Sequence, residues 1–150
     1  MPESPPSETP AALGARLERL GRSLGEREAA HAGALALARR HAESLRAQVE
    51  AALEQFHTAA ARTGAAHLRV DLSEIRAGDK HLRAVEFELT RGCHKAIVVA
   101  KSAGEITLVG PFKRGKAEGP CKTFPFAANA ELGTALGDFL VTLIEEAASP

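Results

Sequence analysis

The spacing of apolar residues changes between positions 64 and 67 of this chain of 150 residues. Before that point apolar residues recur every three or four positions, which is typical of one face of an α-helix. After it they alternate with polar residues, as in a half-buried β-strand, until a final segment returns to helical spacing. The sequence therefore predicts an α+β fold: a long N-terminal helix, an antiparallel sheet and a C-terminal helix.

The N-terminal segment is expected to be disordered over residues 1–9 and helical over 10–64. The first nine residues, MPESPPSET, contain no large apolar side chain that could be buried. Thr9 and Pro10 then have the pattern of a helix start, a hydroxyl cap followed by proline in the first turn. Gly64 supplies the end, because glycine is favoured at the left-handed position that terminates helices.

Two apolar stripes run along this predicted helix. The first, called here the leucine stripe, has spacings of four, three and four and consists of Leu13, Leu17, Leu20 and Leu24. The second follows after eleven residues, a step that keeps one helical face, and consists of Leu35, Ala38, Ala42, Leu45, Val49, Ala52, Phe56 and Ala59. Each glycine in this region weakens the helix by about 1 kcal/mol relative to alanine, so a hairpin broken near Gly33 is the alternative to a continuous helix.

The leucine stripe predicts self-association, with a dimer as the expected state. A continuous helix over residues 10–62 would be roughly 75–80 Å long, whereas a compact domain made of the remaining residues is only about 30 Å across. Much of the helix would then overhang, and burial of each exposed leucine is worth roughly 1.5–3 kcal/mol. We therefore expect residues 10–64 to be an oligomerisation arm and residues 65–150 to be an α+β globular domain.

Residues from Leu68 onward are expected to form a four- to five-stranded antiparallel meander, because the connections are too short for parallel crossovers. Strands are predicted at 68–72, 85–90, 96–100 and 105–109, with a short edge piece at 123–126, and a turn is predicted at 77–80. Glu86 and Glu88 alternate with apolar residues in the second of these strands. We expect both carboxylates to face water.

The last segment is expected to be a helix that covers one face of the sheet. Asn129 fits the cap position at its start. Its apolar face is broad and consists of Leu132, Leu136, Phe139, Leu140, Leu143 and Ile144. Such a face needs burial, and the meander offers the apolar side chains of its strands as the partner.

The basic segment 91–122 is the strongest charge feature. The whole chain carries 19 basic and 19 acidic residues, so no global field favours nucleic acid or membrane. This segment alone has seven basic and two acidic residues, a local net charge of +5. A predicted loop at 110–120 carries part of that charge on a flexible, glycine-containing segment, which is how binding loops are often built. The expected binding residues are Phe112, Lys113, Arg114, Lys116 and Lys122.

Three interpretations of this loop remain open. It could bind an acidic protein surface, it could bind nucleic-acid or other phosphate groups, or its lysines could simply be solvated and protect a sheet edge. Nucleic acid is less favoured than protein, because only three charges lie within the loop and nucleic-acid binders usually neutralise more phosphates. The chain also has no Trp and no Tyr, which removes the best platforms for base stacking.

No convergent set of catalytic residues is evident, so we expect a non-enzymatic protein. Residues 110–117 nearly match the phosphate-binding pattern GxxxxGK[ST], but Ala117 replaces the hydroxyl that holds magnesium. Cys93, His94 and Cys121 lack the spacing of zinc ligands, and neighbours on one strand point to opposite faces, which argues against a Cys–His nucleophile. We therefore expect neither a metal nor a cofactor.

The leading hypothesis is an oligomeric protein-interaction module, an adaptor or scaffold that works through the arm and the basic loop. The alternative is a nucleic-acid- or phosphate-binding protein that uses segment 91–122. Two cysteines are too few for a disulfide framework, and the sequence shows neither a signal-like start nor an apolar run long enough to span a membrane. The expected location is the cytoplasm, without membrane association.

Overall fold

The computed structural model describes residues 9–78, 83–113, 115 and 119–148 of the chain. The chain divides into two compact units, Met1–Gly33 and Ala34–Pro150. Helix α1 (Pro10–Arg62) contributes to both units, a six-stranded antiparallel sheet follows it, and helix α2 (Asn129–Ala148) ends the described chain. The predicted α+β fold is confirmed.

In the first unit, the described residues form the N-terminal part of α1. Thr9 caps the helix as predicted, because its Oγ1 accepts a hydrogen bond from the backbone N–H of Ala12 at 3.1 Å. The helix shows no break near Gly33 and is continuous over 53 residues. Glu18 and Arg22 form an ion pair one turn apart, an exposed contact that supports the helix weakly.

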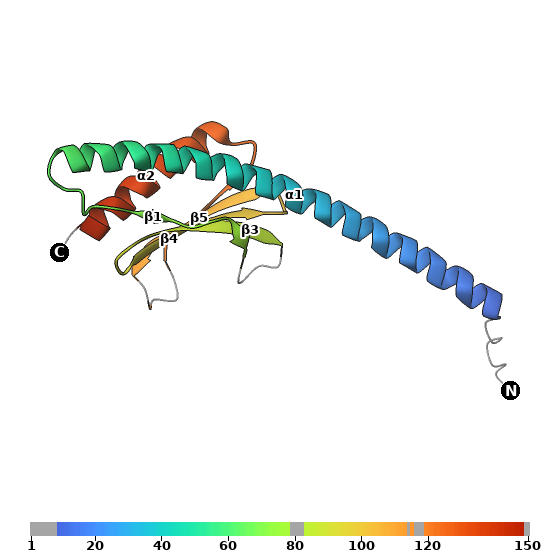
Figure 1. Cartoon of the computed structure of the whole chain (residues 1–150). Coiled ribbons are helices and arrows are strands. Elements are labelled where there is room, and N and C mark those ends of the chain that lie inside the picture. Colours follow the sequence, from blue (N-terminus) through green and yellow to red (C-terminus); the bar gives the residue numbers. More distant parts are fainter. Residues whose placement is uncertain (1–8, 79–82, 114, 116–118, 149–150) are drawn as a thin grey trace. The chain divides into compact units, whose positions relative to one another are not determined.

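The sheet is built around a four-strand meander (Figure 1). Its strands are β3 (Ala84–Arg91), β4 (His94–Lys101), β5 (Glu105–Lys113) and β6 (Cys121–Pro125), each antiparallel to the next. Two short strands, β1 (Asp71–Leu72) and β2 (Arg76–Ala77), both pair with the other edge of β3. The sheet order is therefore β1-β3-β4-β5-β6, with β2 beside β1 along β3.

The observed strand boundaries differ from the predicted ones, most clearly at β1, β2 and β5. Only Asp71 and Leu72 of the predicted strand 68–72 are paired, and part of the predicted turn at 77–80 is strand β2. Strand β5 continues to Lys113, so the first third of the predicted loop 110–120 is strand. The extension is possible because Gly110 adopts a φ of 100° and its N–H donates to the carbonyl of Pro120 at 2.7 Å.

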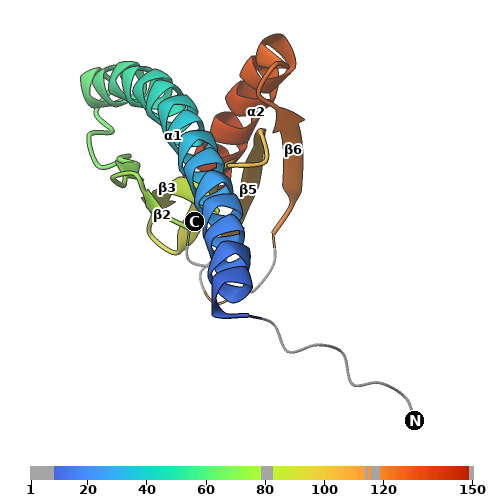
Figure 2. The ribbon, with the colours of Figure 1, turned by 90° about the vertical axis from the view of Figure 1, so that its right-hand side faces the viewer.

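The core lies between one face of the sheet and two helices. Figures 1 and 2 show the 34–62 part of α1 and the whole of α2 on the same side of the sheet. The helices contribute buried side chains from Ala38, Ala42, Leu45, Val49 and Leu53 of α1 and from Leu132, Leu136, Phe139 and Leu143 of α2. These pack with apolar residues of β3, β4 and β5, among which Phe87, Leu89 and Ile106 are fully buried. The predicted cover of the sheet by the last helix is confirmed.

The second apolar stripe of α1 is only partly as predicted. Leu53 is buried, whereas Ala52 is exposed. The predicted stripe alternates spacings of three and four and so repeats every seven residues. A straight α-helix does not repeat exactly every seven residues. The side of the helix that faces the core therefore shifts along the sequence, here from Ala52 to Leu53.

Three contacts attach the second half of α1 to the rest of its unit. The rings of His41 and Phe126 stack with centroids 4.0 Å apart. Farther along, Arg46 Nε donates to the carbonyl of Ser73 at 2.8 Å, and His57 Nε2 accepts the N–H of Val70 at 3.0 Å. Each contact joins α1 to a segment just outside a strand, so the helix is positioned by connections as well as by the core.

Replacement of Phe139 by alanine tests the packing of α2 on the sheet. The ring is buried in the core, so Phe139→Ala is expected to lower the free energy of unfolding by about 3–5 kcal/mol in urea titrations. Val141 lies on the exposed face of the same helix, and Val141→Ala is the matched control, with an expected change within about 0.5 kcal/mol. A loss below about 1 kcal/mol for Phe139→Ala would contradict the burial of its ring.

Candidate functional site

The sheet face opposite the helices carries an ion-pair network. Glu88 Oε2 lies 2.7 Å from Arg76 Nη2 and 2.9 Å from Lys95 Nζ, and Glu86 Oε1 lies 3.6 Å from Arg76 Nε. The expectation that both carboxylates face water is wrong, since Glu86 is only 8% exposed. Strand β2 explains the difference, because its register places Arg76 directly opposite Glu86.

The network determines the ionisation of Glu88. Burial alone would raise the pKa of this carboxyl group, but hydrogen bonds from Lys95 and Arg76, together with their charges, outweigh burial and hold the pKa below its ordinary value. The lowered pKa keeps Glu88 ionised at a lower pH than an ordinary glutamate. The network stabilises the fold rather than forming a reactive acid.

The basic side chains of segment 91–122 do not gather on one surface. Lys95 lies in the ion-pair network on one face of the sheet. Arg91 follows the alternation of Phe87 and Leu89 on the other face, and its Nη1 donates to the carbonyl of His67 at 2.8 Å. Lys101 lies at the opposite end of β4, paired in register with Glu105. Charges that were adjacent in sequence are thus distributed over the whole sheet.

The predicted binding residues fall at two places in the structure. Lys113 is exposed at the end of β5, opposite His94. Lys122 is exposed on β6 and lines a small groove of about 180 Å³ between the β5–β6 hairpin and α2, which Asp138 also lines. Arg114 and Lys116 lie outside the described residues. The structure thus leaves two lysines of the predicted set available for contact.

Phe112 is half-buried rather than exposed. Its ring lies against Gly110 and Gly119, where an added Cβ atom would come within 2.9 and 3.0 Å of the ring. The two glycines leave the space that the ring occupies. Phe112 therefore fixes the base of the β5–β6 hairpin, a role that the sequence did not suggest.

Replacement of Gly110 by alanine tests this packing. An added Cβ would meet the Phe112 ring at 2.9 Å and the carbonyl of Lys95 at 3.0 Å, and the φ of 100° is unfavourable for alanine. We expect Gly110→Ala to cost about 2–4 kcal/mol in urea unfolding, from overpacking and backbone strain together. Gly104 has a similar φ of 97° but no atom within 4 Å, so Gly104→Ala should show only the smaller backbone cost. Equal losses in the two variants would show that the Phe112 contact contributes nothing.

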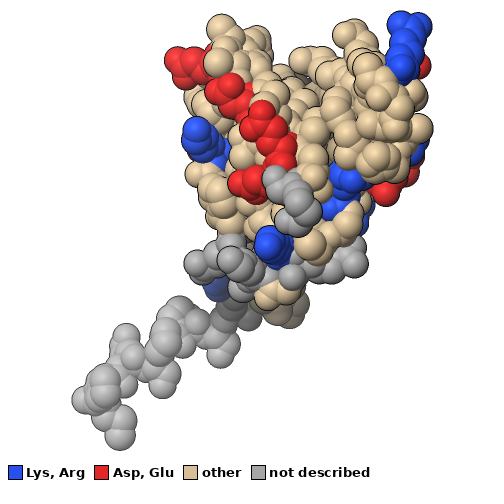
Figure 3. Space-filling view, turned by 90° about the vertical axis from the view of Figure 1, so that its left-hand side faces the viewer, with Lys and Arg blue, Asp and Glu red and all other residues tan. Residues whose placement is uncertain are grey.

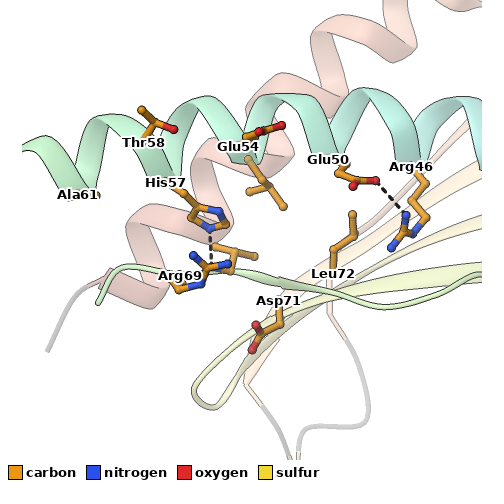
Figure 4. Close-up of a pocket in the computed structure, with 11 residues that line it drawn as sticks. Arg46, Glu50, Glu54, His57, Thr58, Ala61, Arg69, Asp71 and Leu72 are labelled. Atoms are coloured by element: carbon orange, nitrogen blue, oxygen red, sulfur yellow. Dashed lines mark hydrogen bonds and ion pairs between the residues drawn. The ribbon is translucent and has the colours of Figure 1, made fainter. Parts of the chain in front are cut away.

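A groove lies between α1 and the segment that leads into β1 (Figure 4). It has a volume of about 710 Å³, and both signs of charge line it, from Arg46, Glu50 and Glu54 on the helix and from Arg69 and Asp71 opposite. Arg46 is already paired with Glu50 at 3.1 Å. Because neither sign of charge dominates, the groove has no field that would select a charged small molecule.

His57 is one of the residues that line this groove. Figure 4 shows its ring pointing from α1 toward the segment at Arg69, where its Nε2 accepts the Val70 N–H. Burial, followed by the positive charge of Arg69, lowers the pKa of His57, against a smaller opposing effect of Asp71. A protonated ring could not accept the Val70 hydrogen bond, so the contact requires neutral His57.

The lowered pKa predicts a pH dependence of stability. The folded state binds a proton at His57 less readily than the unfolded chain, whose histidines titrate near about 6.5. The stabilisation is therefore complete above that pH and decreases as the pH falls toward the folded-state pKa. We expect His57→Gln, which keeps an acceptor but does not titrate, to reduce the loss of stability between neutral pH and mildly acidic pH in urea unfolding. His67→Gln at an exposed position is the control, and an identical pH slope in parent and His57→Gln would refute the role of His57.

Acidic residues form a row along one face of α2. Glu131, Asp138 and Glu145 are exposed and seven residues apart, so they lie on one face of the helix. In the view of Figure 3, acidic side chains form a row, and the basic side chains around them lie apart from one another. A nucleic-acid interface usually presents a continuous basic surface, which is not what this face presents.

The cysteines and the described histidines are the candidate ligands of a metal ion. Among residues 9–78, 83–113 and 119–148, no cluster of three His, Cys, Asp or Glu side chains is placed to hold a metal ion. Cys93 and Cys121 are free and exposed. Cys93 precedes β4 in a turn, so its Sγ approaches His94 Nδ1 to 3.8 Å, closer than the alternation of a strand would allow. The predicted geometric separation of this pair is therefore wrong.

The largest exposed apolar side chains are concentrated on α1. The leucine stripe is 47–57% exposed, and Leu37 and Val141 are the other large apolar residues at the described surface. Single exposed apolar residues are normal on protein surfaces, but a regular row of four is not. Neither α1 nor α2 is long and apolar enough, within the described chain, to cross a membrane.

Comparisons of the sequence with protein-family models and with curated proteins, and of the fold with solved structures, gave no match. The function must therefore be inferred from the physical properties of the surfaces of this chain.

Proposed function

We propose that this protein is a non-enzymatic oligomeric interaction module, an adaptor or scaffold that pairs with a second copy of itself through the leucine stripe. The observation that carries the proposal is the row of four leucines, each about half exposed, at spacings of four, three and four on one helix. Such spacing is the seam by which helices pair in coiled coils.

The first unit supports the proposal because its described residues form only this part of α1. Helices on their own in water are marginally stable, and most helices in proteins are stabilised by packing of an apolar face. Residues 9–33, the part of the unit that the structure describes, offer no second helix or sheet for the leucine stripe. A second copy of the same helix is the simplest partner that supplies a complementary face.

The magnitude of the gain favours a dimer of moderate affinity. Two copies would bury eight leucines that are already half covered, which is worth about 6–12 kcal/mol in total. Association itself costs an estimated 4–15 kcal/mol. At the favourable ends of both ranges, about 12 kcal/mol gained against about 4 kcal/mol lost, the net of about 8 kcal/mol corresponds to a dissociation constant on the order of micromolar, the tightest affinity that this contact supports.

Lys113 and Lys122, at two separate places on each copy, supply exposed positive charge for an acidic protein partner. A dimer would carry both lysines twice, and linked binding sites increase avidity without any new contact. Binding of nucleic acid has less support, because Arg91 and Lys95 already have partners within the chain.

Charge placed in the leucine stripe tests the proposal. Leu17→Glu combined with Leu20→Glu should convert the dimer to a monomer in sedimentation equilibrium, while the helix signal in circular dichroism is retained because glutamate is a good helix former. Leu37→Glu is the matched control, since Leu37 is 42% exposed on the same helix but outside the stripe. A parent protein that remains monomeric at tens of micromolar would overturn the proposal.

A further inference from the structure

Resting on the proposed self-association, we infer that the two copies pair antiparallel, with Leu13 opposite Leu24 of the second copy and Leu17 opposite Leu20. In this register the two residue numbers in every layer add up to 37. Each copy then places all four of its leucines against leucines. A shift by one helical repeat would instead place Leu13 against His31 and Leu17 against Arg27, which would lose two apolar layers.

The residues that follow the leucine stripe separate the two orientations. Continued at the same spacing, the next inward positions are Arg27 and His31. In a parallel pair, Arg27 would lie against Arg27 of the second copy, and His31 against His31. The two guanidinium groups would then face each other inside the pair, because both helices extend beyond this point. In the antiparallel pair, residue 27 lies opposite residue 10, where the partner helix begins. Arg27 is then at the end of the contact and can reach water.

The glycines beside the leucine stripe give an independent geometric reason. Gly14 and Gly21 each follow a stripe leucine and lie on one flank of it, and no atom lies within 4 Å of a Cβ built at either position. In an antiparallel pair this flank faces itself, so Gly14 lies near Gly21 of the second copy. Four glycines along one side let the helices approach toward the short end of the usual range of about 8–10 Å. In a parallel pair the same flank would face the side that carries Ser23.

The charges at the helix start agree with this orientation. The first turn of α1 contains no acidic residue, so its free N–H groups have no negative side chain nearby from their own helix. In the register that adds up to 37, Glu28 of the second copy lies opposite Thr9. Negative charge near a helix N-terminus is favourable, and the antiparallel pair also opposes the two helix dipoles instead of aligning them.

Distances between spin labels test the orientation separately from the dimer itself. Labels are attached at Ala12→Cys in one sample and at Arg19→Cys in another, both in a Cys93→Ser, Cys121→Ser background. In the antiparallel pair, position 19 lies nearly level with itself, whereas the two copies of position 12 are offset along the helix by roughly 20 Å. We therefore expect the distance at position 12 to exceed that at position 19 by roughly 10 Å.

The outcomes distinguish the two proposals. Similar short distances at both positions would show a parallel dimer, which overturns the antiparallel pairing but leaves self-association intact. A monomer with no intermolecular distance would overturn both.

A pair of glycine variants tests the close approach. Gly21→Gln should raise the dissociation constant of the dimer about tenfold, because the new side chain meets Gly14 of the second copy. Gly25→Gln should leave it within about twofold, because Gly25 is equally open but lies away from the flank. Equal effects would overturn the glycine contact.

Discussion

The rest of the structure depends on the need to bury one face of the antiparallel sheet. Phe87 and Leu89 of β3 and Ile106 of β5 project from that face, and a single antiparallel sheet with one uncovered apolar face would be unstable in water. Helix α2 alone covers part of it, and the second half of α1 supplies the remaining cover. This need accounts for the part of α1 after Gly33, where all of its buried residues lie.

Much of this arrangement could be predicted because periodicity is a local property of the sequence. The change from helical to alternating spacing identified both helices and the main strands, and the inward face of α2 followed from its own residues. Strand β2 could not be predicted in this way, because its two residues are strand only through pairing with β3. The burial of Leu53 instead of Ala52 likewise depends on how far a straight helix turns before it leaves the sheet.

The candidate site was less predictable than the fold, since it depends on register. Lys95 and Glu88 are separated in sequence by a turn, and only the pairing of β3 with β4 brings them to 2.9 Å. A count of charges along segment 91–122 cannot distinguish a lysine in an ion pair from one that is available to a partner. Phe112 shows the same limit, because the glycines that accommodate its ring lie on either side of it in sequence, at positions that resemble a mobile loop.

The contacts that hold α1 have a consequence for the synthesis of the chain. His41 stacks on Phe126, which lies 85 residues later in the sequence, so the Phe126 ring is synthesised long after His41. At about 5–20 residues per second, the ribosome needs roughly 4–17 s to produce that interval. During this time the sheet is still incomplete and α2 has not been made, so the inward face of α1 lacks part of its cover. The nascent chain therefore exposes part of the apolar surface of α1 for seconds, which is long enough for a chaperone to bind before the fold is complete.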